Sequence, residues 1–305
     1  MTMMSREAFR ANTVSRMRWS RVFSTSQPTE GLRLAFTSAS PRIVPFVPKR
    51  DREHVAPKQR RPFKNKVPPP ISDAERAYIQ DLILYEDAHV LAFAKPSGLA
   101  VQSGSGIERS VDGLLWAFAR RNGKRPKLVH RLDRETSGVL VTAKTQPAAA
   151  ALSAAFADRT AHKTYQAILC GGAPDPADGI VDLALVKINE AGLDIMRGAR
   201  ERDRDALAAR THYRTLATNA AATFVEVEPE TGRMHQIRVH MASLGKPIAG
   251  DTKYGGLFML AGLPVPRLML HARRLEVPHP SGSGRLTLEA ELPPEMADFR
   301  TRLGL

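Results

Sequence analysis

From residue 71 onward the chain alternates short apolar runs with turn-forming residues, and this pattern constrains the fold most. The runs are β-branched and switch between apolar and polar positions, as strands do. Between them lie segments with helical signals: an N-cap residue such as Asp73, alanine-rich sequence, or apolar residues at i, i+4 and i+7. The sequence therefore predicts a mixed α+β domain. Expected strands are 82–85, 90–94, 139–141, 162–169 and 223–227, with a hairpin turn at 87–89, and expected helices are 74–81, 114–121, 147–157 and 237–244.

The first 70 residues have a different composition. They contain many Pro, Ser and Arg residues, and prolines such as those at 68–70 prevent a continuous helix or a central strand. They hold 15 Lys and Arg against four acidic residues, so they carry +11 of the formal charge of +14. We therefore predict a basic, mostly disordered tail over 1–70 and a folded domain over 71–305, whose remaining +3 must be concentrated on one face if the domain binds nucleic acid.

The tail leaves the cellular location open between two interpretations. An Arg-rich, Ser-rich and acid-poor N-terminus is typical of a mitochondrial transit peptide, and a bacterial chain with a basic tail would look the same. We favour the second, cytoplasmic interpretation because the Ala- and Arg-rich composition continues through the folded part. No apolar run approaches the roughly 18 to 20 residues that a membrane-spanning helix needs, so no membrane segment is expected.

The strongest functional signal is the segment 130–145, which reads His-Arg-Leu-Asp-Arg-Glu-Thr-Ser-Gly-Val-Leu-Val-Thr-Ala-Lys-Thr. Asp133 stands between Arg131 and Arg134, and neighbouring cations favour an ionised carboxylate. A Thr-Ser-Gly turn is expected at 136–138, before the strand at 139–141. A carboxylate held at the mouth of a strand suits a nucleophile or base that acts on a polyanion. The alternative is a surface loop whose charges pair locally.

This segment resembles the signature of the RluA-type pseudouridine synthases, His-Arg-Leu-Asp-x-x-Thr-Ser-Gly followed by aliphatic residues. Three further blocks agree with that family in order and spacing, and together the four are highly specific. The resemblance covers roughly residues 78 to 292. The further blocks are 83–100, His162-Lys163-Thr164-Tyr165, and Glu230-Thr231-Gly232-Arg233-Met234-His235-Gln236-Ile237-Arg238-Val239-His240 with its continuation to Gly250-Asp251 and Tyr254-Gly255; a last echo is 270–275.

The resemblance implies a largely antiparallel sheet with a central RNA-binding cleft, and an isomerase that converts specific uridines of rRNA or tRNA to pseudouridine. The reaction breaks the N1 glycosidic bond, turns the base and joins C5 to C1′. It needs no redox step and no metal, so no cofactor is expected. By resemblance Asp133 is the essential carboxylate. Whether it attacks the sugar, attacks the base or abstracts a sugar proton stays open.

Two further residues are assigned to the chemistry by resemblance. Arg238 matches the arginine that the family places beside the catalytic Asp, where a two-point guanidinium contact would orient the carboxylate; the alternative is a contact to phosphate. Tyr165 matches the tyrosine that stacks on the target base, an interaction worth roughly 1–3 kcal/mol. Without the resemblance, a tyrosine in an alternating strand would be interpreted as core.

The expected RNA contacts are basic residues of the same blocks. By analogy with the family, Arg131 fills the gap left by the nucleotide that is flipped out of the RNA. Lys95 and Arg233 are expected to contact phosphate, and Arg134 and His130 complete the predicted RNA-binding set. RNA is therefore the expected partner, while no obligate protein partner is evident and a monomer is expected.

Other kinds of site find little support in the sequence. The histidines at 130, 235, 240 and 271 could suggest a metal, but no carboxylate or cysteine joins them at ligand spacing. Gly104-Ser105-Gly106 lacks the Lys-Ser/Thr ending of a phosphate-binding loop. The single cysteine, Cys170, cannot form an internal disulfide and has the pattern of a buried strand residue.

Two rival functions remain as alternatives. A catalytically silent RNA-binding or ribosome-assembly protein would be expected to lack Asp133, Tyr165 or Arg238, and all three are present. An unrelated hydrolase would need a nucleophile in an elbow motif, and none is found. The sequence does not identify the RNA or the uridine, for which loops such as 104–112 and 187–210 would supply specificity.

Overall fold

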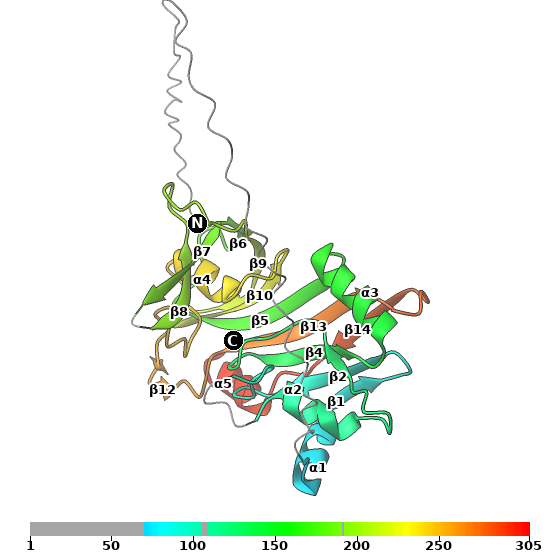
Figure 1. Cartoon of the computed structure of the whole chain (residues 1–305). Helices are drawn as coiled ribbons and strands as arrows, with labels where there is room; N and C mark the ends of the chain where they lie inside the picture. Colours follow the sequence, from blue (N-terminus) through cyan, green and yellow to red (C-terminus); the bar gives the residue numbers. More distant parts are fainter. Residues whose placement is uncertain (1–69, 105–108, 191) are drawn as a thin grey trace, which may run out of the picture. The chain divides into compact units, whose positions relative to one another are not determined.

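A computed structural model describes residues 70–104, 109–190 and 192–305. The predicted tail lies outside these residues except for residue 70. In the described part, a ten-stranded sheet runs in the order β1-β2-β4-β13-β5-β10-β9-β6, with β3 paired to β4 and β14 paired to β13 (Figure 1). The strands of this sheet are β1 Ile83–Glu86, β2 Val90–Lys95, β3 Lys127–Leu128, β4 Ser137–Ala143, β5 His162–Cys170, β6 Asp178–Asp182, β9 Arg210–Thr218, β10 Ala222–Pro229, β13 Leu270–Pro278 and β14 Arg285–Glu289.

Two small hairpins and several short helices complete the described part. The hairpins are β7 Leu185–Glu190 with β8 Leu193–Gly198, and β11 Met259–Leu260 with β12 Leu263–Pro264. The α-helices are α1 Asp73–Asp81, α2 Val111–Leu114, α3 Gln146–Ala157, α4 Gln236–Ser243 and α5 Pro294–Arg302, and a 3-10 helix, η1, spans Leu115–Phe118. No helix among residues that the structure describes is both long enough and apolar enough to cross a membrane.

The sheet is antiparallel except at one junction, where β4 and β13 run parallel. Gly138 lies at this junction with φ +116°, and a Cβ placed there would come within 2.2 Å of the backbone oxygen of Ala272. Only glycine fits a position that combines positive φ with such a close backbone approach. The predicted mixed, largely antiparallel α+β fold is therefore confirmed, and Gly138 joins the two central strands.

Alternate residues of β4 enter two different apolar layers. Val139 and Val141 pack with Leu152 of α3, whereas Leu140 on the opposite face packs with Ile79 of α1. Farther along the sheet, a third cluster joins β5 and β10 to α4 and α5. Successive side chains of a strand point to opposite faces of the sheet, so a strand covered on both faces contributes to two apolar layers. This packing fixes the strand that follows Asp133.

Most predicted elements are present, with three local corrections. Helix α1 is capped by Ser72 rather than Asp73, because Ser72 and Glu75 form a reciprocal capping box. The helix expected at 114–121 begins earlier, where the Ser110 hydroxyl accepts the Gly113 N–H, and it tightens into η1 before ending at Phe118.

The third correction concerns the turn after Asp133. The turn closes at Thr136, whose N–H donates to the Asp133 carbonyl at 3.2 Å, so Ser137 and Gly138 already belong to β4. Asp133 is therefore separated from the buried strand by only one tight turn.

Candidate active site

The predicted catalytic residues line one cavity of about 490 Å³, a size common for small-molecule pockets. Its walls come from the segment before β4, from β5 and from the N-terminal end of α4. Asp133, Tyr165 and Arg238 all contribute to the lining, as do three of the predicted RNA-binding residues. Those three are His130, Arg131 and Arg233. Residues more than 100 positions apart in the sequence thus meet around a single space.

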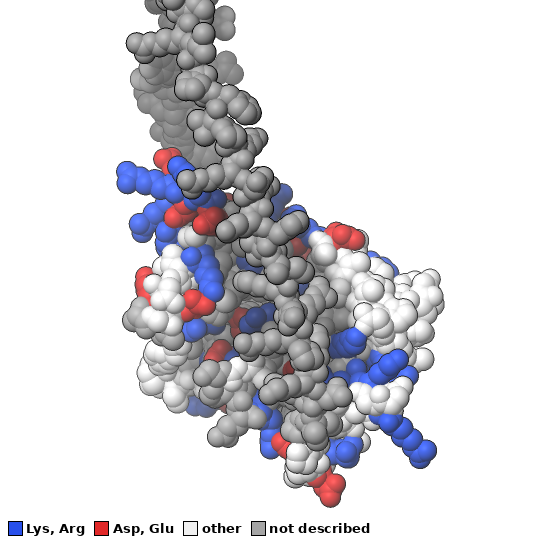
Figure 2. All heavy atoms as spheres, viewed as in Figure 1, with Lys and Arg blue, Asp and Glu red and all other residues white. Residues whose placement is uncertain are grey.

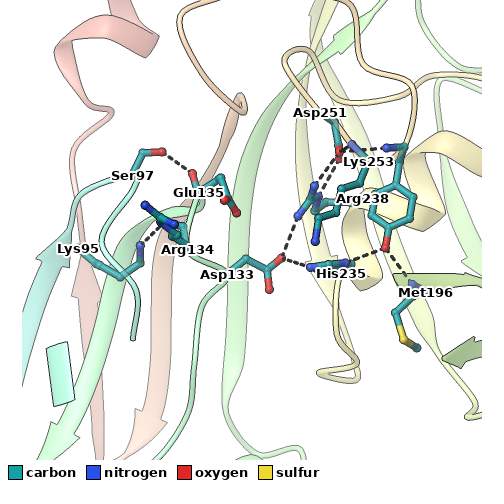
Figure 3. Close-up of polar contacts among 11 residues, drawn as sticks. Lys95, Ser97, Asp133, Arg134, Glu135, Met196, His235, Arg238, Asp251 and Lys253 are labelled. Carbon is teal, nitrogen blue, oxygen red and sulfur yellow. Dashed lines mark hydrogen bonds and ion pairs between the residues drawn. The ribbon is translucent and has the colours of Figure 1, made fainter. Parts of the chain in front are cut away.

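A buried lysine forms a hydrogen bond to the loop that carries Asp133. Lys95 is 1% exposed, and its ammonium donates to the backbone oxygens of Pro96, Leu99 and Arg134 at 2.9, 2.8 and 3.0 Å. Figure 3 shows the link from Lys95 to Arg134, next to Asp133 in the chain. The predicted phosphate contact of Lys95 is wrong, because all three donors are used inside the protein. Lys95 instead ties the end of β2 to the loop that carries Asp133.

Arg238 lies beside Asp133, but its two-point contact is with another carboxylate. Its Nε and Nη2 donate to Asp251 Oδ2 and Oδ1 at 2.8 and 2.7 Å, while Nη1 lies 3.7 Å from Asp133 Oδ2 (Figure 3). The predicted bidentate contact of Arg238 with Asp133 is therefore wrong. Asp251 is fully buried and fixes the guanidinium so that Nη1 is the nitrogen left nearest Asp133. Nη1 is itself buried without a hydrogen-bond partner in the described part of the chain.

A second cation-capable side chain approaches the same oxygen of Asp133. His235 Nε2 lies 3.9 Å from Asp133 Oδ2, and His235 Nδ1 lies 2.7 Å from the Tyr254 hydroxyl. The Tyr254 hydroxyl in turn accepts the backbone N–H of Met196 at 3.0 Å. No catalytic or binding role was predicted from the sequence for Asp251, His235 or Tyr254. The only sequence signal for them was that all three fall inside the blocks shared with the family.

Tyr165 is both core and cavity wall. It lies on β5 opposite Val227 and Ala272, and its ring packs against two of the apolar clusters. Burial raises the pKa of Tyr165, and the Asp133 carboxylate raises it further, so the phenol is neutral at physiological pH. Both interpretations that the sequence left open for this tyrosine therefore describe part of its surroundings.

The predicted RNA-binding arginines differ in solvent exposure and in whether their side chains form hydrogen bonds within the protein. Arg131 is exposed at the cavity, while the Arg233 side chain donates to the Ala208 carbonyl at 3.2 Å. Arg134 is exposed outside the cavity lining and donates to the Gly98 carbonyl at 3.0 Å. On the face of the molecule viewed in Figure 2, Lys and Arg side chains are interspersed with Asp and Glu over the part that is not drawn in grey. The cations on that visible part do not form one continuous patch.

His130 has a structural environment at the cavity wall. Its Nε2 accepts the N–H of Val141 in β4 at 2.9 Å, and its ring stacks on Phe156 with centroids 4.5 Å apart. Burial lowers the pKa of His130 to about 3, with Lys163 contributing, so the ring is neutral. A neutral imidazole offers no charge to a phosphate. Any polar contact of His130 with RNA would use its neutral Nδ1–H donor and not a charge.

Similarity to known proteins assigns the chain to a family. The sequence matches the RNA pseudouridylate synthase family over residues 89–243, about half of the chain. The chain belongs to the RNA pseudouridylate synthase family. It is an isomerase that acts on RNA.

Three known proteins show the extent of the similarity. Ribosomal large subunit pseudouridine synthase D of Zymomonas mobilis is 36% identical over 228 residues, which cover 70% of each chain. The mitochondrial pseudouridylate synthase RPUSD4 of Xenopus tropicalis is 37% identical over 257 residues, covering 71% of this chain and 79% of the relative. The solved structure of human RNA pseudouridylate synthase domain containing 4 superimposes with a TM-score of 0.64 at 28% identity, covering 76% of this chain and 97% of that one.

Proposed function

We propose that Asp133 is the catalytic carboxylate of this synthase and that the substrate is a uridine of large-subunit ribosomal RNA. The observation that carries the catalytic assignment is the convergence of Arg238 and His235 on one oxygen of Asp133 at the cavity wall. The choice of ribosomal RNA over tRNA is supported by the bacterial relatives, which are named ribosomal large subunit synthases.

The isomerisation moves uracil from a nitrogen linkage to a carbon linkage without a net change of atoms. The bond between N1 and C1′ breaks, the base turns, C5 bonds to C1′, and the proton lost from C5 is balanced by one that ends on N1. An ionised Asp133 supplies the negative charge that engages the sugar or the base. Arg238 Nη1, 3.7 Å from Asp133 Oδ2, places a positive charge beside this carboxylate.

Tyr165 is proposed to hold the target base. Its position on the cavity wall allows ring stacking on an unpaired base, and its neutral hydroxyl is able to donate or relay a proton. Arg131 and Arg233 are proposed to contact the RNA around the flipped nucleotide. Arg131 is the exposed one of the two, which suits it to replace the extruded base; flipping costs a few kcal/mol.

The experiment is pseudouridine mapping of total RNA from cells that lack this protein. One or a few uridines of large-subunit RNA should lose the modification. The wild-type chain should restore them, and Asp133→Asn should not. Retention of every pseudouridine in the deletion strain would contradict the substrate assignment, whereas restoration by Asp133→Asn would contradict the catalytic assignment.

We also propose that residues 71–305 form the catalytic domain, that the chain acts as a monomer and that it works in the cytoplasm. The domain boundary is supported by Ser72, which caps α1, and by Ile79 of α1, which is buried in the core. A chain lacking residues 1–70 should fold and remain active, with weaker and less salt-dependent RNA binding because +11 of the charge is removed. Import of the tagged full chain into mitochondria would favour the alternative location, which matches the name of the Xenopus tropicalis relative.

A further inference from the structure

Asp133 meets its two neighbours through the same oxygen. Arg238 Nη1 is 3.7 Å and His235 Nε2 is 3.9 Å from Oδ2, and in the described part of the chain neither closest contact involves Oδ1 (Figure 3). Both distances exceed a hydrogen bond, as is common for catalytic contacts before the substrate binds. Oδ2 is therefore the oxygen of Asp133 closest to both neighbours, and Oδ1 takes no part in either closest contact.

The hydrogen bonds of Tyr254 favour a proton on Nε2 of His235 over one on Nδ1. The Tyr254 hydroxyl accepts the Met196 N–H, so its own proton is available for His235 Nδ1, at 2.7 Å. Burial raises the pKa of Tyr254, so the phenol keeps that proton. A histidine that accepts at Nδ1 carries its proton on Nε2 when neutral. Nε2 is the atom that points toward Asp133.

The charge state of His235 agrees with this arrangement. Burial lowers the pKa of His235; Asp133 opposes the effect, whereas the nearby Arg238 and Lys253 charges add to it. The ring is therefore neutral at physiological pH, with a single N–H to direct. The guanidinium carbon of Arg238 also lies 5.2 Å from the centroid of the Tyr254 ring. Tyr254 therefore contacts both neighbours of Asp133.

We propose that His235 and Tyr254 are positioning residues of the synthase: Tyr254 locks His235 as the Nε2–H tautomer, and His235 with Arg238 holds Oδ2 so that Oδ1 engages the nucleotide. This inference rests on the proposed catalytic role of Asp133. The competing explanation is that His235 only shapes the backbone at the start of α4, where it has φ +53°.

Two substitutions of His235, to Gln and to Asn, separate these explanations. The two explanations predict opposite orders of turnover for the two variants. Gln places an amide N–H near the position of Nε2, whereas Asn places one near Nδ1. Asn tolerates positive φ better than Gln, so a backbone role favours Asn. The positioning role predicts that His235→Gln keeps most of the single-turnover rate, and that His235→Asn loses about 100-fold with unchanged RNA affinity, the scale expected for a misplaced catalytic group. Asn should nevertheless be the more stable variant.

Nitrogen NMR of the full chain reads the tautomer directly. The His235 signals, identified by their absence in His235→Gln, should show a proton on Nε2 and none on Nδ1. In Tyr254→Phe both tautomers should appear and turnover should fall, because the locking hydroxyl is gone. A proton on Nδ1 in the wild-type protein would overturn the proposal.

A matched control and a reference variant complete the test. His279→Gln changes another histidine that contacts an aspartate, Asp87 at 2.7 Å, outside the cavity lining, and it should leave turnover unchanged. Asp133→Asn measures the proposed function itself. If Asp133→Asn is inactive while the Gln and Asn variants of His235 lose equal turnover, or Asn is the faster, the positioning role fails and the catalytic carboxylate stands. If Asp133→Asn remains active, the proposed function fails as well.

Discussion

The two walls of the cavity hold their charged groups in different ways. On one wall, the Arg238 guanidinium is matched by a buried carboxylate, Asp251, through two short hydrogen bonds. On the other, the Lys95 ammonium that supports the Asp133 loop is bound only by neutral backbone oxygens, and no carboxylate in the described part of the chain lies within ion-pair distance of it.

This difference has a functional meaning. The negative charge of Asp251 is used by Arg238, so only one corner of the guanidinium is left for Asp133. Asp133 is 20% exposed at its side chain and stays free for the substrate. Burial lowers the pKa of Lys95 to about 7, while the charges of Glu135 and Asp133 oppose this shift. Burying the Lys95 ammonium therefore costs free energy, and its role is to hold the loop in place. One wall is stabilised by charge pairing and the other by the geometry of a loop.

The largest effect is expected when the charge pair is broken. Asp251→Asn leaves a buried guanidinium without its anion, a change that costs about 3–5 kcal/mol. Urea unfolding should show this loss of stability, and turnover should fall because Arg238 is free to rotate. Asp298→Asn, which removes an exposed pair to Arg302, should leave the unfolding midpoint unchanged. Equal stability of the two variants would show that the buried pair does not anchor this wall.

The opposite wall should respond to Lys95→Met by roughly 3 kcal/mol, the upper end for buried groups left without partners. Methionine fills similar space but leaves three carbonyls without a donor, so the Asp133 loop should relax and turnover should fall with it. Lys124→Met, at an exposed lysine outside the cavity lining, provides the control. A fully active Lys95→Met enzyme would mean that the loop is positioned without the ammonium.

Arg238→Lys should lower turnover by about 100-fold, equivalent to about 2.7 kcal/mol in the barrier. Lysine keeps the charge but cannot hold Asp251 at two points and reach toward Asp133 as well. Arg233→Lys should be mild and should mainly change the salt dependence of RNA binding. If Arg233→Lys is the inactive enzyme and Arg238→Lys the mild one, the partner of Asp133 has been assigned to the wrong arginine.

The smallest effect concerns pH and the neutral groups beside the Asp133 loop. His271 is buried against Ser137 of β4, and burial lowers its pKa to about 4. Its ordinary pKa is 6.5, so as the pH falls from 6.5 to 4 the unfolded chain takes up a proton before the folded one does. Stability should therefore fall with pH in that window, by on the order of 1–2 kcal/mol between pH 7 and 5. His271→Gln should show a smaller decrease in unfolding free energy; an equal decrease would assign the effect to other groups.

The strands and the cavity residues were predictable because their signals are local or belong to ordered blocks. β-Branching and alternation located β2, β4 and β5, and the blocks brought Asp133, Tyr165 and Arg238 to one site. The parallel pairing of β4 with β13 was not predictable from local pattern, since it joins residues more than 130 positions apart.

The predictions for Lys95 and Arg238 were wrong because they depend on which side chains are buried, and a sequence does not show burial. Lys95 precedes Pro96, Ser97 and Gly98 and was interpreted as a surface cation, because nothing local shows that a loop 39 residues away covers it. The carboxylate that binds Arg238 lies 13 residues further along the chain, beyond the end of α4. Only the folded chain shows which of two nearby carboxylates receives the two-point contact.

The catalytic role of Asp133 is tested by a comparison of two neighbouring carboxylates under the same conditions. Asp133→Asn and Glu135→Gln each remove one negative charge from the same loop, but Glu135 is exposed and lies outside the cavity lining. Pseudouridine formation should be measured in single turnover with the same RNA at fixed salt. Asp133→Asn should lose about 1000-fold or more with unchanged RNA affinity, as expected for a group that acts in the chemical step, and Glu135→Gln should keep the wild-type rate. A near-normal rate for Asp133→Asn would contradict the catalytic role of Asp133.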